Sequence, residues 1–171
     1  ALNGQVLTFE FNNTEVNNLI TPGRIRVNYA GSTVTPASLS AAINTAITLA
    51  QSDVDVVIID CDLRRPRLHS HFGLENTRGL TNYLSGDKDT VGLIRTFEQL
   101  PRLKIITSGP IPPNPAELLS SNEMRNLLQF LSGKFKHVIV DSPPAISFTD
   151  AAILSTLVDG VVLVAMANKS S

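Results

Sequence analysis

The segment VVIIDCDLRRPRLHS, Val56 to Ser70, joins an apolar run to a dense group of charged side chains. Four β-branched residues precede Asp60, and such a run is typical of a strand that helices cover on both faces. Two aspartates, Asp60 and Asp62, flank a cysteine at the end of this run. Three arginines follow, Arg64, Arg65 and Arg67. Carboxylates suit a divalent cation and guanidiniums suit a phosphate, so the segment predicts a ligand site at a strand end.

Apolar strands alternate with helical segments in the rest of the chain. We expect strands at Val6–Phe11, Arg24–Tyr29, Val54–Asp60, Arg102–Gly109, Lys136–Ala145 and Gly160–Ala167. We expect helices at Thr35–Gln51, from about Ala116 to Leu131 and at Thr149–Asp159, with short helical turns within 69–75 and 79–87. Thr35 and Pro36 are suited to the N-cap and first position of their helix. This alternation predicts an α/β fold, a parallel sheet with helices on both faces.

Length and composition bound the functional classes. The 171 residues fit one domain, with an atypical strand-and-turn segment at 1–23 and the core at 24–171. The net charge of -1 disfavours nucleic-acid binding, and the single cysteine excludes an intrachain disulfide. No signal peptide or membrane-spanning apolar run is evident. The first residue is Ala1 rather than methionine, so we expect a piece of a longer chain, with any membrane anchor outside it.

Three aspartates are candidates for a metal–nucleotide site. Asp60 and Asp62 follow one buried strand and Asp141 ends another, and ligands of open parallel sheets bind outside the carboxyl ends of strands. If those strands are neighbours, the carboxylates converge, and Mg²⁺ prefers one or two carboxylates plus phosphate oxygens. For Asp60 alone, a turn-forming role is the better interpretation. For the three together, with Arg64 and Arg65 beside them, we favour the site.

The other polar residues have ordinary interpretations. The arginines suit phosphate recognition, inter-subunit ion pairs or a solvated turn about equally well. His69, His71 and His137 lack cysteine or glutamate partners at metal-ligand spacing, so no zinc site is predicted. Cys61 has acidic neighbours and is interpreted as a packed residue. Thr149 or Asp150 is expected to cap the helix that follows.

Several motifs resemble those of the bacterial tyrosine kinase (BY-kinase) family, relatives of the MinD/ParA ATPases that act in capsule and exopolysaccharide export. They are DCDLRRPRLH, GPIPPNPAELL, DSPP, TDA and VDGVVLV, and the resemblance extends from about Leu49 to Asn168. It implies a P-loop NTPase-like, three-layer α/β/α fold. It also implies that Asp60 and Asp62 form the catalytic Walker A′ motif, that Asp141 is the Walker B aspartate, and that Asp141 and Asp60 hold Mg²⁺.

The phosphate-binding loop departs from this family. The family pattern GxxxxGK[ST] provides backbone N–H groups, a lysine for the β/γ-phosphates and a hydroxyl for Mg²⁺. Ungapped counting places Ala37 at the second glycine, Ser38 at the lysine and Leu39 at the hydroxyl, followed by Ser40, and no lysine precedes Lys88. Loss of one electrostatic stabiliser of this kind typically costs a hundredfold or more in rate, on the order of magnitude of an oxyanion-hole donor. Mg-ATP or Mg-ADP is therefore expected to bind weakly or not at all.

Two further family features are missing from the sequence. The only tyrosines are Tyr29 and Tyr83, without a tyrosine-rich tail, which truncation of the chain would explain equally well. Residues 1–23 lack the family's ring-forming Glu–Arg–Arg helix. We therefore favour a catalytically impaired domain with a regulatory or binding role in polysaccharide export. Its expected partner is a membrane co-polymerase (chain-length-determinant) region or an active kinase paralogue, at the cytoplasmic face of the plasma membrane.

Two alternatives stay open. One is an active ATP-dependent tyrosine autokinase or ATPase that takes a lysine from elsewhere, such as Lys169 or a neighbouring subunit of a homo-oligomer, or that uses Arg64 or Arg65. The other is a structural module of the same fold that binds nothing.

Overall fold

The computed structural model describes residues 7–9, 23–30, 37–90, 92–144 and 148–165. The helices are α1 (Ala37–Gln51), α2 (Leu68–His71), α3 (Leu80–Leu84), α4 (Pro115–Ser120), α5 (Asn122–Lys134) and α6 (Asp150–Ser155). The strands are β1 (Leu7–Phe9), β2 (Gly23–Ala30), β3 (Val56–Asp60), β4 (Arg95–Thr96), β5 (Leu103–Ile106), β6 (His137–Asp141) and β7 (Gly160–Ala165). Strands and helices alternate along the chain as the sequence predicts.

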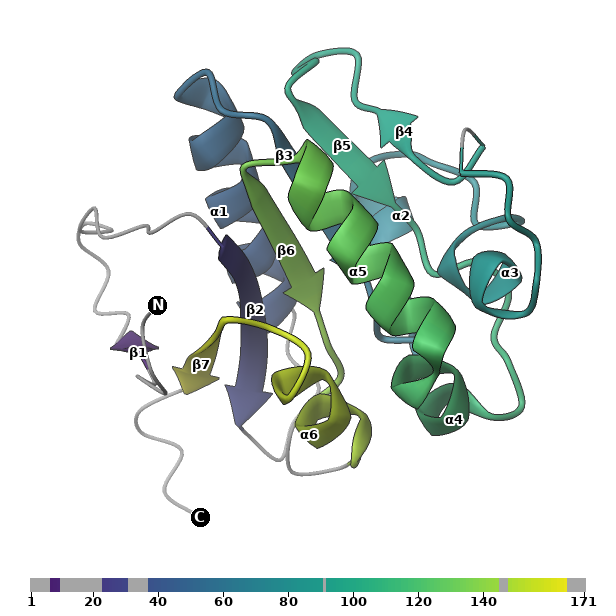
Figure 1. Ribbon diagram of the computed structural model, residues 1–171. Helices are drawn as coiled ribbons and strands as arrows, with labels where there is room; N and C mark the ends of the chain where they lie inside the picture. Colours follow the sequence, from purple (N-terminus) through teal and green to yellow (C-terminus); the bar gives the residue numbers. More distant parts are fainter. Residues whose placement is uncertain (1–6, 10–22, 31–36, 91, 145–147, 166–171) are drawn as a thin grey trace.

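The described strands form one sheet in the order β1-β7-β2-β6-β3-β5-β4 (Figure 1). Every pairing is parallel except that of β4 with β5, which is antiparallel. The predicted α/β class is therefore confirmed. The two-residue β4 at the sheet edge was not predicted, because a strand of that length is too short to show a periodic pattern.

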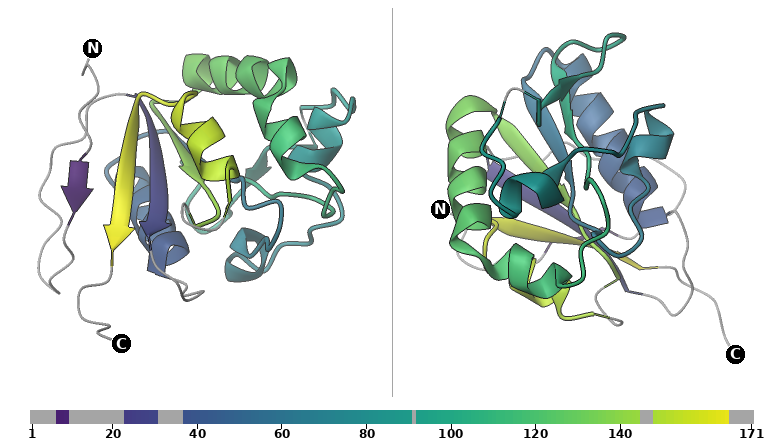
Figure 2. Two further views of the ribbon diagram at one scale, coloured as in Figure 1. Left: turned by 90° about the horizontal axis from the view of Figure 1, so that it is seen from below. Right: turned by 90° about the vertical axis from the view of Figure 1, so that its right-hand side faces the viewer.

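Helices cover both faces of the sheet, and β3 shows how. Val56 and Ile58 pack into the apolar cluster that contains α1 and Leu68 of α2. Val57 and Ile59 point to the opposite face and join the cluster formed by α3, α4, α5 and α6. All four side chains are fully buried. Figure 2 shows α1 and α5 on opposite sides of the sheet, which confirms the predicted three-layer arrangement.

The single helix predicted from about Ala116 to Leu131 is wrong, because two helices meet at Ser121. Its backbone is extended, with φ −65° and ψ 161°, so it cannot continue α4. The Ser121 hydroxyl accepts a hydrogen bond from the Met124 backbone N–H at 3.2 Å and so caps the start of α5. The same hydroxyl donates to the Leu118 carbonyl at 2.6 Å. Ser-Asn in this position was an overlooked helix-start signal.

Several other predicted elements are shorter in the structure. β3, β5 and β6 each lie inside the predicted strand, and α6 ends at Ser155 rather than Asp159. Thr35 and Pro36, the predicted start of α1, lie outside the described residues. Within the part of the chain that is described, no helix is long and apolar enough to span a bilayer.

Candidate phosphate and metal site

The carboxyl ends of β3 and β6 bring two aspartates side by side. Asp60 and Asp141 are register partners in the parallel pair, and the Cys61 N–H donates to the Asp141 carbonyl at 2.9 Å. Both carboxylates are buried, with 0% and 5% of each residue exposed. The expectation that these strands are neighbours is confirmed (Figure 1). Two acidic side chains therefore share the edge where parallel sheets bind ligands.

Asp60 uses both carboxylate oxygens to hold its own loop. Oδ1 accepts from the Asp62 N–H at 3.2 Å, and Oδ2 accepts from the Leu68 N–H at 3.1 Å. Burial raises the pKa of Asp60 to about 7, although the Leu68 hydrogen bond opposes the shift, and the nearby Asp62 charge adds to it. This is the turn-forming role favoured for Asp60 alone. Asp60 can still contribute negative charge beside Asp141.

Asp62 also organises backbone. Its Oδ1 accepts from the N–H groups of Arg64 at 3.2 Å and Arg65 at 3.0 Å. Burial is the main cause of a raised pKa for Asp62, these two hydrogen bonds oppose it, and the charge of Asp150 raises it further. Asp60 and Asp62 together therefore shape the loop between β3 and α2.

Asp141 differs because one of its oxygens has no partner. Oδ1 is buried and makes no hydrogen bond in the described part of the structure. Burial raises the pKa of Asp141 well above its usual value, and the charges of Asp60 and Asp62 raise it further. A buried oxygen without a partner normally needs an explanation such as an ion. The donor chemistry fits Mg²⁺, which takes carboxylate oxygens.

The described carboxylates do not form a metal cage by themselves. No group of three or more His, Cys, Asp or Glu side chains among the described residues lies close enough to hold an ion. A Mg²⁺ ion held through Asp141 would therefore need oxygens from water or a phosphate, as is usual for this ion. Asp60, Asp62 and Asp141 are nevertheless close enough for the charges of the first two to raise the pKa of the third.

Arg64 has a specific buried partner that the sequence did not reveal. Its Nε donates to Asp150 Oδ2 at 2.7 Å and its Nη2 donates to Asp150 Oδ1 at 3.1 Å. The Asp150 side chain is 0% exposed, and the guanidinium carbon lies 4.4 Å from the Phe148 ring centroid. The Asp150 hydrogen bond raises the pKa of Arg64. No local pattern joins residues 86 positions apart, so only the fold reveals this pair.

The predicted capping of α6 is wrong. Thr149 stands at the N-cap position but makes no side-chain capping hydrogen bond, and Asp150 lies inside the helix. The Asp150 carboxylate instead accepts both bonds from Arg64. The Arg64–Asp150 pair therefore ties the loop after β3 to the helix that follows β6.

Arg65 and Arg67 remain exposed beside this pair. Neither makes an ion pair within the described residues, although the charge of Arg65 lowers the pKa of Asp62. Their backbone is fixed by the carboxylates of Asp60 and Asp62. Among the three arginines predicted to bind phosphate or form an interface, Arg65 and Arg67 have no acidic hydrogen-bond partner for the guanidinium within the described residues, whereas Arg64 has one.

The first turn of α1 contains Ser38 and Leu39, which ungapped counting of the sequence aligns with the family's lysine and hydroxyl. Residues 31–36 lie outside the described residues, and helical backbone begins at Ala37 and Ser38. Leu39 is 6% exposed and joins Ala42 in the apolar cluster on this face of the sheet. Ser40 is half-buried. Leu39 thus serves as a core residue.

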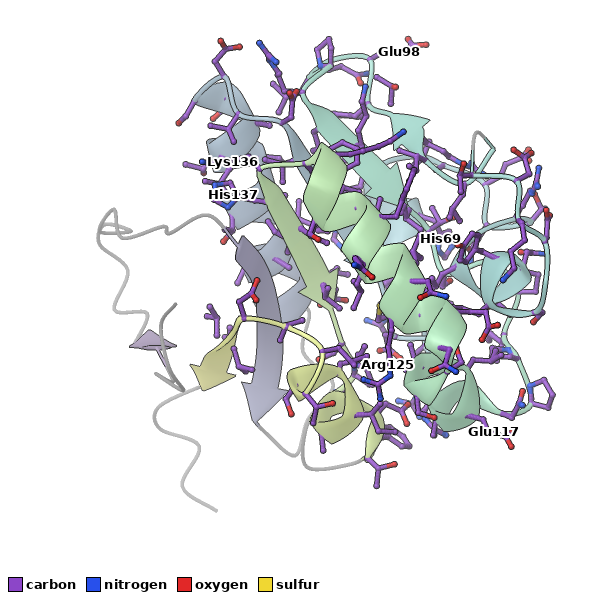
Figure 3. The ribbon with its side chains drawn as sticks, in the orientation of Figure 1. His69, Glu98, Glu117, Arg125, Lys136 and His137 are labelled. Atoms are coloured by element: carbon purple, nitrogen blue, oxygen red, sulfur yellow. The ribbon has the colours of Figure 1, made fainter. Side chains whose placement is uncertain are left out.

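Three of the four described lysines make contacts with other parts of the chain. Lys88 and Lys134 lie over the rings of Tyr83 and Phe130, at 4.8 and 4.5 Å from the centroids. Lys104 Nζ donates to the Thr96 hydroxyl and the Pro101 carbonyl, both at 2.9 Å. Figure 3 shows Lys136 at the amino end of β6. It lies five residues before Asp141, or roughly 16 Å along an extended strand. Lys169, the other candidate, lies outside the described residues.

Cys61 is fully buried within the apolar cluster on the α5 face. The interpretation of this cysteine as a packed residue is confirmed.

Comparison with known proteins gives a consistent set of relatives. No protein-family model matches the chain. The tyrosine-protein kinase ptk of Acinetobacter johnsonii is 50% identical over 112 residues, covering 66% of this chain and 15% of ptk. The tyrosine-protein kinase YwqD of Bacillus subtilis is 43% identical over 129 residues, covering 75% of this chain and 54% of YwqD. The chain thus spans about half or less of the length of these two relatives.

Solved structures agree with the sequence matches. The VpsO kinase domain superimposes with a TM-score of 0.76 at 31% identity, covering 82% of this chain and 68% of that domain. The septum site-determining protein MinD of Pyrococcus horikoshii, solved with Mg-ADP, superimposes with a TM-score of 0.65 at 17% identity, covering 82% and 57%, and shows likeness of fold alone. The fold is therefore P-loop NTPase-like. On the sequence identity, the coverage of the VpsO domain and the shared fold, this chain belongs to the bacterial tyrosine kinase (BY-kinase) family.

Proposed function

We propose that this chain is a BY-kinase domain that lacks an effective triphosphate grip of its own and acts by binding a partner. The observation behind this proposal is the absence of a lysine before Lys88, combined with contacts of Lys88, Lys104 and Lys134 elsewhere and the position of Lys136 at the amino end of β6. A phosphate tail needs a positive charge in a poorly solvated site, because that charge stabilises the negative charge that grows during transfer.

The packing of Leu39 supports the same proposal. The family's hydroxyl at this position ligates Mg²⁺, whereas the Leu39 side chain is buried among apolar residues of α1 and the sheet. An aliphatic side chain cannot donate an oxygen to a metal ion. Leu39 stabilises the helix start instead, so the first turn of α1 has exchanged a binding role for a packing role.

The acidic half of the site keeps a chemical use. Mg²⁺, when bound, would neutralise phosphate charge, and Asp141 is the residue that would hold it through the unpartnered Oδ1. Asp60 would add negative charge from the neighbouring strand, while its oxygens keep the loop in place. Asp62 would position the backbone of Arg64 and Arg65. In this account, the carboxylates support weak Mg-nucleotide binding at most.

A second candidate is an ATP-dependent tyrosine kinase or ATPase completed by a cation from elsewhere. The unpartnered oxygen of Asp141 favours it, because a buried site with no ligand has no evident reason to keep that oxygen unbonded. Arg64 is a poor local replacement, since Asp150 holds two of its nitrogens. Lys169 or a lysine of a second copy is the better source.

The setting of this role follows from the relatives. We propose that the domain acts in capsule or exopolysaccharide production, at the cytoplasmic face of the membrane. Its partner would be a membrane co-polymerase or a catalytically intact kinase. The chain covers 54% of the length of the relative YwqD and 15% of ptk, so further segments of a longer protein could supply the membrane contact.

Thermal unfolding with Mg-ATP and Mg-ADP tests the proposal. A ligand present at a hundred times its Kd adds about 2.7 kcal/mol to stability, which is readily seen in a melting curve. We expect no shift at millimolar nucleotide. A clear shift that disappears in Asp141→Asn would instead favour the second candidate. The exposed substitution Asp159→Asn is the matched control, because it removes the same charge away from Asp141.

A further inference from the structure

The loop from Asp62 to Leu68 has a fixed shape before any ligand arrives. Asp62 accepts two of its backbone N–H groups, and Asp60 accepts the N–H of Leu68 at its far end. Leu63 and Leu68 anchor the loop with 0% exposure. Pro66 further restricts the backbone between the two arginines. A surface presented by this loop therefore loses little conformational entropy on binding.

The loop divides its three arginines between two roles. Arg64 turns inward to the fully buried Asp150. Arg65 and Arg67 stay exposed, without an ion pair among the described residues. This contrasts with two other loop arginines of the chain, because Arg78 pairs with Asp87 and Asp89, and Arg102 pairs with Asp53 and Asp55. The exposed pair is left available for an external anion.

The spacing of this pair suits one phosphoryl group. Arg65 and Arg67 are two residues apart, so their Cα atoms are separated by about 7 Å at most. Two arginine side chains can close that distance onto a single phosphate, and each guanidinium fork matches two phosphate oxygens. Asp62 offsets part of the charge of Arg65, so both guanidiniums are needed to hold a dianion.

We propose that Arg65 and Arg67 form a docking site for a phosphotyrosine side chain of a partner protein. This site deepens the binding role proposed above and rests on it for the choice of tyrosine, because the sequence relatives are named tyrosine-protein kinases. The phosphate meets the exposed arginines from the solvent side, and the buried Asp141 does not contact it. The domain would thereby distinguish a phosphorylated partner from an unphosphorylated one.

Fluorescence anisotropy tests this site directly. The probe is a labelled short glycine–alanine peptide with one central phosphotyrosine, measured against the same peptide with tyrosine, in EDTA at fixed ionic strength. We expect the phosphopeptide to bind at least about tenfold more tightly, a difference of about 1.4 kcal/mol. The Arg65→Ala/Arg67→Ala double variant should reduce its affinity to that of the unmodified peptide. Arg125→Ala, which removes an exposed arginine of α5 (Figure 3), should leave it unchanged.

Three further measurements test whether the site is specific for phosphotyrosine or attracts any anion. Arg65→Lys/Arg67→Lys keeps both positive charges but removes the two-pronged guanidinium groups. We expect this variant to lose most of the preference for the phosphotyrosine peptide over the tyrosine peptide. The assignment would be overturned if the lysine variant bound the phosphotyrosine peptide as tightly as the native chain does. It would also be overturned if a phosphoserine peptide bound as tightly as the phosphotyrosine peptide, or if ADP displaced the labelled peptide at the same concentration as free phosphotyrosine. EDTA removes Mg²⁺ from the peptide-binding assay, so this assay and the thermal-shift assay with Mg-nucleotide are independent. A phosphopeptide that does not bind refutes only the docking site, and a thermal shift with Mg-ATP refutes only the proposed lack of nucleotide binding.

Discussion

Removing the guanidinium of Arg64 should destabilise this domain far more than removing an ordinary surface arginine. Arg64→Ala would leave the Asp150 carboxylate, now 0% exposed and held by bonds of 2.7 and 3.1 Å, without its cation. Breaking a buried pair from one side costs about 3–5 kcal/mol. Because 32% of the Arg64 side chain is exposed, we expect the lower end, about 3 kcal/mol.

The assay is urea unfolding with a parallel thermal melt. For a domain of this size, each kcal/mol moves the Tm by roughly 2–4 °C, so Arg64→Ala should lower it by about 6–12 °C. Arg102→Ala is the matched control, since Arg102 also donates to carboxylates, but its partners Asp53 and Asp55 are 83% and 53% exposed. Exposed pairs contribute about 1 kcal/mol or less.

A combined substitution separates the buried charge from the packing. Arg64→Met/Asp150→Leu removes both charges together, and such replacements are often neutral or stabilising. We expect this double variant to recover most of the stability lost in Arg64→Ala. If Arg64→Ala costs no more than Arg102→Ala, the view of Arg64–Asp150 as a buried link between the loop after β3 and α6 is refuted.

The raised pKa of Asp60, about 7 against 3.8, means that the native state binds a proton more tightly than the unfolded state between those values. The free energy of unfolding should therefore fall as pH rises from 4 to 7, and the raised pKa of Asp141 adds a contribution of the same sign. Urea titrations at pH 5, 7 and 9 check this sign, and stability that rises with pH over this range would contradict it. Asp141→Asn should make this fall in stability smaller, because it removes one of the two contributions. Leu39→Thr should cost about 2 kcal/mol, because it removes buried apolar volume, with Ser40→Thr as a half-buried control. Ser121→Ala should cost about 1 kcal/mol by removing the α5 cap, whereas Ser132→Ala on the same helix should cost much less.

Strand positions could be predicted because the core strands are apolar and β-branched. Val56–Asp60 and His137–Asp141 lie inside predicted strands, and the alternation with helices implied a parallel sheet. The break at Ser121 was missed because the hydrophobic period continues across it, although Ser121 itself is a favoured cap.

The acidic site was only partly predictable. The positions of Asp60 and Asp141 at strand ends follow from local sequence, and parallel pairing then brings them together. Sequence could not show that both Asp60 carboxylate oxygens accept hydrogen bonds from backbone N–H groups, whereas one Asp141 oxygen makes no hydrogen bond in the described structure. Nor could it link Arg64 to Asp150, since that contact depends on how the loop after β3 meets α6.

Calorimetric titration of Mg-ATP into the native chain and a restored-loop variant tests the central claim most directly. The variant carries Ala37→Gly, Ser38→Lys and Leu39→Thr, and Leu39→Thr alone is the control for its loss of packing. We expect no measurable heat of binding for the native chain and for the Leu39→Thr control, and saturable binding for the restored loop. Saturable binding of Mg-ATP by the native chain, with an affinity like that of the restored loop, would contradict it.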